Sequence, residues 1–140
     1  MKQYPLVIAG AAVWAVAWFM PVIVGEPTLL DGRIPGWQAF RQSLNPIWPY
    51  LHPNAGDLTW FDVLGVASGL TNFVFIGALL MTGAARPAAP WWKVLLGCGL
   101  LNTFWLFMDG AAADLRIGYY LWVSSYFLLS VAYRALAMRR

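Results

Sequence analysis

Polar side chains inside otherwise apolar segments are the residues whose types and spacing could do chemistry. Counted at about 1.5 Å of helical rise per residue, they fall near one depth in three different segments. Their amide and hydroxyl groups could line a small polar cavity for water, an ion or a lipid headgroup. They could equally hydrogen-bond across helices and fix the helix register. The four that define this layer are Ser68, Asn72, Asn102 and Ser125, with Thr71 and Thr103 adjoining the two asparagines and Ser124 beside Ser125.

The apolar segments hold no Asp, Glu, His, Lys or Arg well away from their ends. Ion pumps and proton-coupled antiporters need such a group in the membrane, so the sequence disfavours both classes. One histidine, His52, cannot form a bis-histidine haem site, and one cysteine, Cys98, cannot form an intrachain disulfide. We therefore expect no metal, no cofactor and no catalytic residue. A membrane enzyme would need Asp57, Asp62, Asp109 or His52 to converge in a pocket at the outer surface.

The composition is that of a membrane protein. Of the 140 residues, 61% are hydrophobic and only 11% are charged, whereas a soluble domain carries about 25% charged residues. A soluble fold of this size could not bury so much apolar surface. The cations that give the net charge of +3 are spread along the chain, so we expect no nucleic-acid partner.

Four apolar segments of roughly the length that crosses a bilayer, about 20 residues, divide the chain. Their continuous apolar runs lack the alternation of membrane strands. The predicted fold is all-α, an integral membrane bundle of four transmembrane helices in a single domain, 1–140. A cleaved signal peptide is the alternative for the first segment. The predicted spans cover about 4–24, 60–82, 91–108 and 118–138, and a proline, Pro21, is expected to kink or end the first.

A short amphipathic helix is predicted at 37–44, within the outer loop 25–59. Trp37, Phe40 and Leu44 share its apolar face, which would lie flat in the headgroup region. Arg41 could bind a lipid phosphate or a partner's carboxylate, or could be an ordinary interfacial arginine that snorkels. Further along, Thr59 and Asp62 have the spacing of a capping box that opens the second span.

Small residues on the second span predict close helix packing. Gly65, Gly69 and Gly77 lie in its apolar sequence, and the first two form a small-xxx-small motif. We expect the motif to pack within the chain, against the alanine-rich face of the first span (Ala11 and Ala15). A dimer seam is the alternative.

The charges predict the orientation. With both termini in the cytoplasm, the inner side holds six cations and no acid, and the outer side holds three cations and all six acids. An excess of Lys and Arg in cytoplasmic loops is the general rule for multi-pass proteins. The inner cations are Lys2, Arg86, Lys93, Arg134, Arg139 and Arg140, and the outer ones are Arg33, Arg41 and Arg116.

Two stretches carry a resemblance. PGWQAF at 35–40 and GYYLWVSS at 118–125 look similar to uncharacterised small bacterial inner-membrane proteins with four spans. This resemblance implies a multi-pass protein of the bacterial inner (plasma) membrane and implies no activity.

The expected function is non-enzymatic. We expect an accessory or scaffold subunit of a membrane complex, or a homo-oligomer, because the chain has little loop mass and no catalytic constellation. Its partners would be membrane lipids and other membrane subunits or a second copy of itself. The alternative is a small channel, or a bundle that binds a lipid or small solute at the polar layer.

Overall fold

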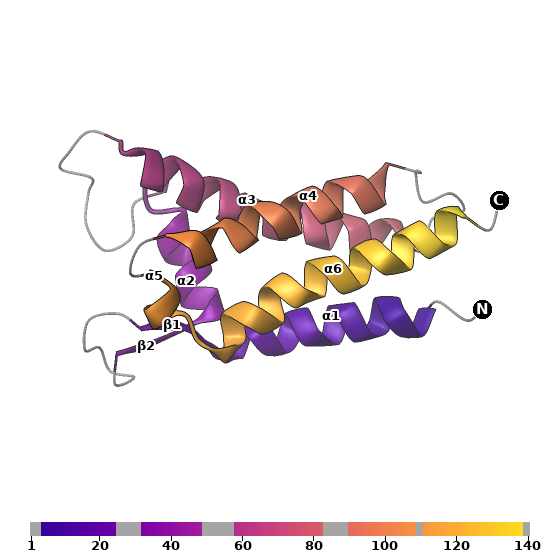
Figure 1. Cartoon of the computed structure of the whole chain (residues 1–140), viewed down its shortest axis with the longest axis horizontal. Coiled ribbons are helices and arrows are strands. Elements are labelled where there is room, and N and C mark those ends of the chain that lie inside the picture. The colour runs from indigo at the N-terminus through magenta and orange to yellow at the C-terminus, as the bar shows by residue number, and fades with distance from the viewer. Residues whose placement is uncertain (1–3, 25–31, 49–57, 83–89, 109–110, 139–140) are drawn as a thin grey trace.

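The computed structural model describes residues 4–24, 32–48, 58–82, 90–108 and 111–138, and these residues are mostly helical. The helical class is therefore confirmed. Figure 1 shows long helices side by side, with the short elements gathered at one end. The elements in order are α1 (Tyr4–Phe19), β1 (Pro21–Val24), β2 (Arg33–Pro35), α2 (Gly36–Ser43), α3 (Trp60–Met81), α4 (Trp91–Thr103), the 3-10 helix η1 (Phe104–Phe107), α5 (Ala111–Asp114) and α6 (Ile117–Ala137).

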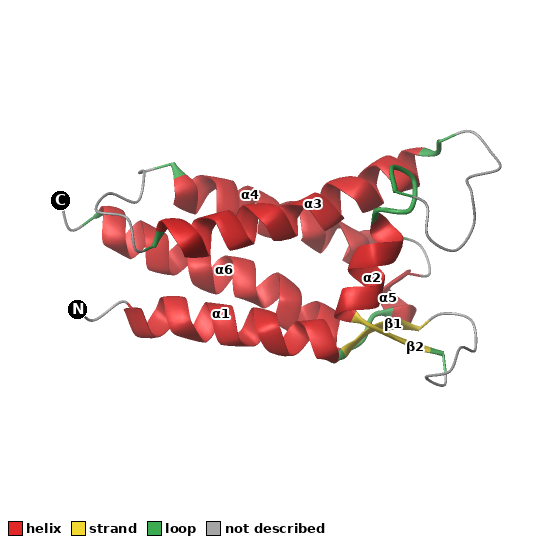
Figure 2. Ribbon diagram, turned by 180° about the vertical axis from the view of Figure 1, so that it is seen from behind, coloured by secondary structure: helices red, strands yellow, loops and turns green. Residues whose placement is uncertain are grey.

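The four long helices run alternately up and down (Figure 1). α6 packs against α1 on one side and α4 on the other, and α3 packs against α4 and α2. Figure 2 shows the two strands, α2 and α5 at the end of the bundle opposite the start of α1. One part of the core lies between the long helices around Phe75 and Tyr126, and a second part lies near the strands around Leu115 and Tyr119.

The first predicted span ends earlier than expected, which corrects its bounds of 4–24. α1 stops at Phe19, and residues 21–24 form a strand paired antiparallel with β2. The cause is local. Pro21 has no N–H to continue the helical ladder, and a proline disfavours helical geometry at the residue before it, Met20. Val22, Ile23 and Val24 are β-branched and favour an extended chain.

The other predicted helices lie close to their expected positions. α3 (Trp60–Met81) ends one residue before the predicted span 60–82, and α6 (Ile117–Ala137) begins and ends one residue before the predicted span 118–138. The capping box is present: Asp62 N–H donates to Thr59 Oγ1 at 3.3 Å, and Thr59 N–H donates to Asp62 Oδ2 at 2.8 Å. The third predicted span, 91–108, is α-helical to Thr103 and then tightens into η1.

Helix α2 packs on the glycine motif, which corrects the expectation that the motif packs against the first span. A Cβ on Gly69 would lie 2.3 Å from Ser43 Oγ and 3.2 Å from a methyl of Leu44. A Cβ on Gly65 would lie 3.9 Å from the Ser43 carbonyl oxygen, and one on Gly77 would lie 3.9 Å from the Trp91 ring. Because α2 covers Gly69, that glycine is not available for a dimer seam.

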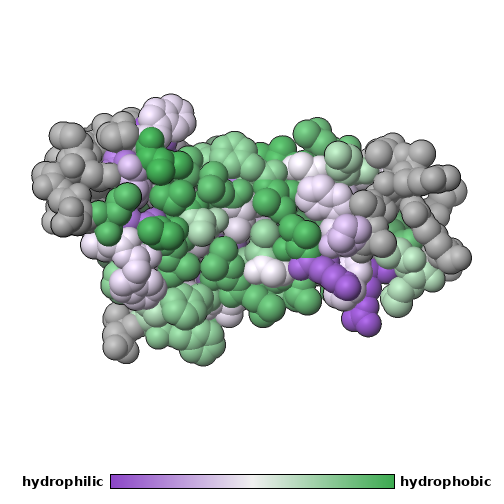
Figure 3. All heavy atoms as spheres, turned by 90° about the horizontal axis from the view of Figure 1, so that it is seen from above, coloured by the Kyte–Doolittle hydropathy of each residue, from purple (hydrophilic) through white to green (hydrophobic). Residues whose placement is uncertain are grey.

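Large apolar side chains point outward from all four long helices. Examples are Ile8 on α1 (66% exposed), Leu80 on α3 (77%), Leu100 on α4 (58%) and Val131 on α6 (57%). Figure 3 shows one such face, apolar across its middle with hydrophilic side chains toward both ends. By length and composition one described helix, α3, could cross a membrane, and α1 is apolar but shorter.

Gly36, the first residue of α2, gives a test of how α2 meets the bundle. A Cβ there would lie 2.4 Å from the Ala17 carbonyl oxygen and 2.9 Å from Trp18 Cα, which are backbone atoms that cannot turn away. We expect Gly36→Ala to lower the free energy of unfolding by about 1–3 kcal/mol. Gly97→Ala on α4 is the control, because nothing lies within 4 Å of its Cβ.

Alanine is the better helix former, so Gly97→Ala should be neutral or stabilising. Reversible denaturation of the two variants in detergent measures both effects. Equal stabilisation by the two substitutions would show that α2 does not pack closely on the end of α1.

Candidate functional site

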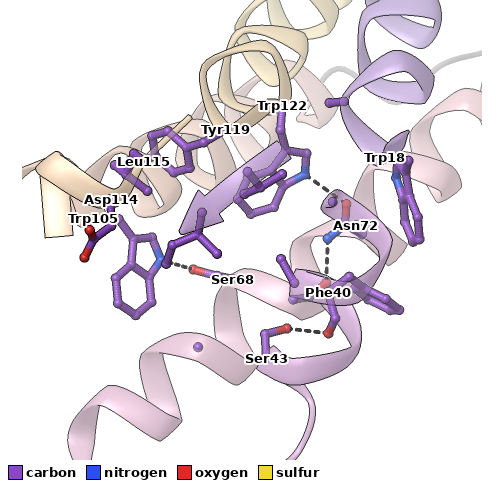
Figure 4. Close-up of a pocket in the computed structure, with 17 residues that line it drawn as sticks. Trp18, Phe40, Ser43, Ser68, Asn72, Trp105, Asp114, Leu115, Tyr119 and Trp122 are labelled. Carbon is purple, nitrogen blue, oxygen red and sulfur yellow. Dashed lines mark hydrogen bonds between the residues drawn. The ribbon is translucent and has the colours of Figure 1, made fainter. Parts of the chain in front are cut away.

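A cavity of about 270 Å³ opens at the strand end of the bundle. Figure 4 shows its walls, which come from every element except β2 and α4. Most of the wall is apolar, and aromatic rings form a large part of it. The aromatic lining residues are Trp18, Phe40, Trp105, Tyr119 and Trp122.

The inner end of the cavity is organised by the Asn72 side chain. Its Oδ1 accepts two indole N–H bonds, from Trp14 on α1 at 3.1 Å and from Trp122 on α6 at 3.0 Å. Its Nδ2 donates to the carbonyl oxygen of Gly69 at 3.0 Å. The amide is buried, and its two bonds to half-buried indoles of α1 and α6 tie three long helices together.

Other polar side chains of the wall also form hydrogen bonds within the protein. Trp105 Nε1 donates to Ser68 Oγ at 2.9 Å, which links η1 to α3. The Tyr119 hydroxyl donates to the backbone carbonyl of Asn102. These bonds fix the orientation of two aromatic rings in the wall.

A second network lies beside the cavity and centres on Thr71. The Thr71 hydroxyl donates to the Ser68 carbonyl at 2.6 Å, so its oxygen accepts from Asn102 Nδ2 at 3.0 Å and from the Tyr126 hydroxyl at 2.9 Å. Asn102 Nδ2 also donates to the Cys98 carbonyl at 2.8 Å. Asn102 is fully buried, and its Oδ1 finds no donor among the described residues.

The predicted polar layer is thus divided in the structure. Ser68 and Asn72 line the cavity, whereas Asn102 lies behind its wall. Ser125 is buried but donates back to the Trp122 carbonyl of its own helix at 2.6 Å. Ser124, its neighbour, is exposed.

The three interfacial residues predicted in the outer loop take different positions. Phe40 lines the cavity and packs its ring 5.2 Å from that of Trp18. Trp37 is 45% exposed. Arg41 donates from Nη1 to the Trp48 carbonyl oxygen at 2.7 Å, and its guanidinium lies 4.1 Å from the Trp48 ring centroid.

Asp114 marks the mouth of the cavity, because among the lining residues it alone is exposed. No group of three or more His, Cys, Asp and Glu side chains that could hold a metal occurs in the part of the chain that the structure describes. Of the residues considered for surface catalysis, Asp62 caps α3 and does not line the cavity. His52, Asp57 and Asp109 lie outside the described residues.

Sequence reasoning did not identify the tryptophans that donate hydrogen bonds to Ser68 and Asn72. The sequence did contain an indication of this pairing. An indole N–H within an apolar segment needs an acceptor, and Asn72 is such an acceptor at mid-span. Nothing in the sequence indicated that Asp114 lines a cavity, because it lies in a short loop between two predicted spans.

No family model, curated protein or solved structure matches this chain. The function of the cavity is therefore argued from the geometry of its own residues.

Asn72→Leu tests the central hydrogen bonds. The substitution would leave two indole N–H groups without an acceptor, and an unsatisfied buried donor costs about 1–3 kcal/mol. We expect a loss of that order in the free energy of unfolding, measured by denaturation in detergent. Ser124→Leu is the control, because it places the same side chain on an exposed position of α6. A wild-type stability for Asn72→Leu would contradict a structural role for its amide.

Proposed function

We propose that this protein is a four-span bundle of the bacterial inner membrane that binds a small lipophilic molecule in the cavity. The observation that carries the binding function is the cavity itself, about 270 Å³ with mostly aromatic and aliphatic walls and a few polar groups. Pockets of this character, usually about 300–1,000 Å³, are the general form of small-molecule sites.

The exposed apolar surface supports a membrane location. Monomeric soluble proteins rarely expose contiguous apolar patches above a few hundred Å². Here large apolar side chains face outward on all four long helices. Hydrocarbon around the bundle would remove these side chains from water.

Helix length and the placement of polar residues support four spans. α3 has 22 residues and α6 has 21, so each is about 32 Å long, close to the bilayer core of about 30 Å. Several polar side chains of α6 are buried inside the bundle, so its average hydropathy understates how apolar its outer face is. The buried polar residues of α6 are Tyr119, Ser125, Tyr126, Ser130 and Tyr133.

α1 is shorter, with 16 residues, and β1 continues it. Non-helical backbone is tolerated near a membrane only where its polar groups are paired. β1 meets that condition, because it pairs with β2, forms a bridge from Ile23 to Leu115, and accepts a bond from Arg116 N–H at the Val22 carbonyl.

The distribution of Lys and Arg over the full sequence supports an orientation with both termini in the cytoplasm, because six of the nine cations fall on that side. Lys93 at the start of α4 and Arg134 near the end of α6 lie at one end of the bundle. The other end of the bundle holds Asp62 and Asp114 together with the three remaining described cations, Arg33, Arg41 and Arg116 (Figure 1). The cavity then opens on the extracytoplasmic side.

Binding is better supported than passage across the membrane. Beyond Asn72 the bundle is filled by side chains with no exposed surface, among them Phe75, Tyr126 and Leu129. The polar groups that a channel would use are already paired within the protein, with threonine, tyrosine and tryptophan side chains. The alternative of a lipid-binding or solute-binding bundle therefore fits the geometry better than a channel.

An accessory or scaffold role in a membrane complex or homo-oligomer is a second candidate. Adjacent aromatic side chains at the start of α3, Trp60 and Phe61, are 54% and 47% exposed. A partner subunit could cover them in place of lipid. Recovery of a single chain after gentle solubilisation would exclude this role.

Cysteine labelling tests the proposed topology. In a Cys98→Ser background, Arg33→Cys should react with a membrane-impermeant maleimide in intact cells, because it is exposed at the extracytoplasmic end. Arg134→Cys should react only after the membrane is opened. Equal labelling of both positions in intact cells would contradict the proposed orientation.

Filling the cavity tests the binding function. A neutral bromoalkyl alcohol should quench part of the tryptophan fluorescence saturably in wild type, because three tryptophans line the wall. Ala39→Phe fills space at the wall, so we expect it to weaken this binding at least about tenfold. Gln38→Phe is the control, since Gln38 adjoins Ala39 on α2 but does not line the cavity. Absence of saturable quenching in wild type would refute binding.

A further inference from the structure

The wall of the cavity carries a negative charge, whereas the described cations at this end of the bundle lie outside the lining. Asp114, at the mouth, is the lone charged residue of the lining, and no Lys or Arg lines the cavity among the described residues. The Asp114 carboxylate makes no hydrogen bond or ion pair with the part of the chain that is described. The nearby Arg116 directs its guanidinium to the backbone carbonyls of Ala113 and Leu115, at 2.8 and 3.2 Å.

The walls offer aromatic faces more than hydrogen-bond donors. The N–H groups of Trp105 and Trp122 and the hydroxyl of Tyr119 are used within the protein. Their rings line the cavity. Figure 4 shows Trp105 on the same side of the cavity as Asp114, and α5 packs against η1. A carboxylate next to aromatic faces is the arrangement that binds organic ammonium groups.

We propose that the ligand is an amphipathic organic cation, with its ammonium group at Asp114 and Trp105 and its apolar body between Trp18, Phe40 and Trp122. This inference rests on the proposed binding function and specifies the ligand class. A cation at the mouth gains from the carboxylate and from the ring faces. An anion would meet a like charge and few free donors, so the site rejects it.

The test compares three amphiphiles that have the same number of non-hydrogen atoms: hexyltrimethylammonium, 1-nonanol and hexanesulfonate. Binding to the full chain in nanodiscs of neutral lipid is measured by saturable changes in tryptophan fluorescence. We expect hexyltrimethylammonium to bind more tightly than 1-nonanol, and hexanesulfonate to bind most weakly. Asp114→Asn should weaken the cation about three- to tenfold and leave 1-nonanol unchanged.

Asp62→Asn is the matched control, because it removes the same charge from the same end of the bundle without touching the cavity wall. Asp114 is exposed, so its amide variant should fold normally, and unchanged 1-nonanol binding confirms this. Equal affinity for cation and alcohol, or equal loss of cation binding in both variants, would overturn the cation proposal alone. Failure of all three probes to bind wild type would overturn the binding function as well.

Discussion

The arrangement of this bundle depends on one buried amide. Asn72 accepts the indole N–H groups of Trp14 and Trp122, so α1, α3 and α6 meet at one point. In a low-dielectric interior such polar groups have no water to replace a lost partner. The amide therefore sets how far the helices can separate, and it holds Trp122 where its ring forms part of the cavity wall.

The same constraint accounts for the position of the cavity at the strand end of the bundle. On the inner side of Asn72, aromatic rings stack tightly, with Trp14 and Phe75 centroids 5.3 Å apart and Phe75 and Tyr126 centroids 5.0 Å apart. On the side of Asn72 that faces the strands, α2 lies across the ends of the long helices and packs on Gly69. A short helix laid across the ends of long ones cannot fill the space beneath it as completely as a parallel neighbour would.

The helices were predictable because each long apolar run has little alternative to a helix. The bounds of α3 and α6, and the Thr59–Asp62 cap, follow from local sequence alone. The strand at residues 21–24 could not be predicted from local sequence, because its pairing depends on residues 33–35 and Leu115, which come later in the chain. For the same reason the sequence showed that Gly69 would meet a close neighbour but did not identify α2. It also located Ser68 and Asn72 without showing that tryptophans bind them.

The strand β1 also determines when the cavity can exist. Its Val22 carbonyl accepts from the N–H of Arg116, and its Ile23 bridges to Leu115, both at the start of the last long helix. α1 has α6 as its main neighbour, although the two helices lie far apart in the sequence. Because a chain is synthesised from its N-terminal side, the cavity lacks the wall that Tyr119 and Trp122 form until α6 has been made.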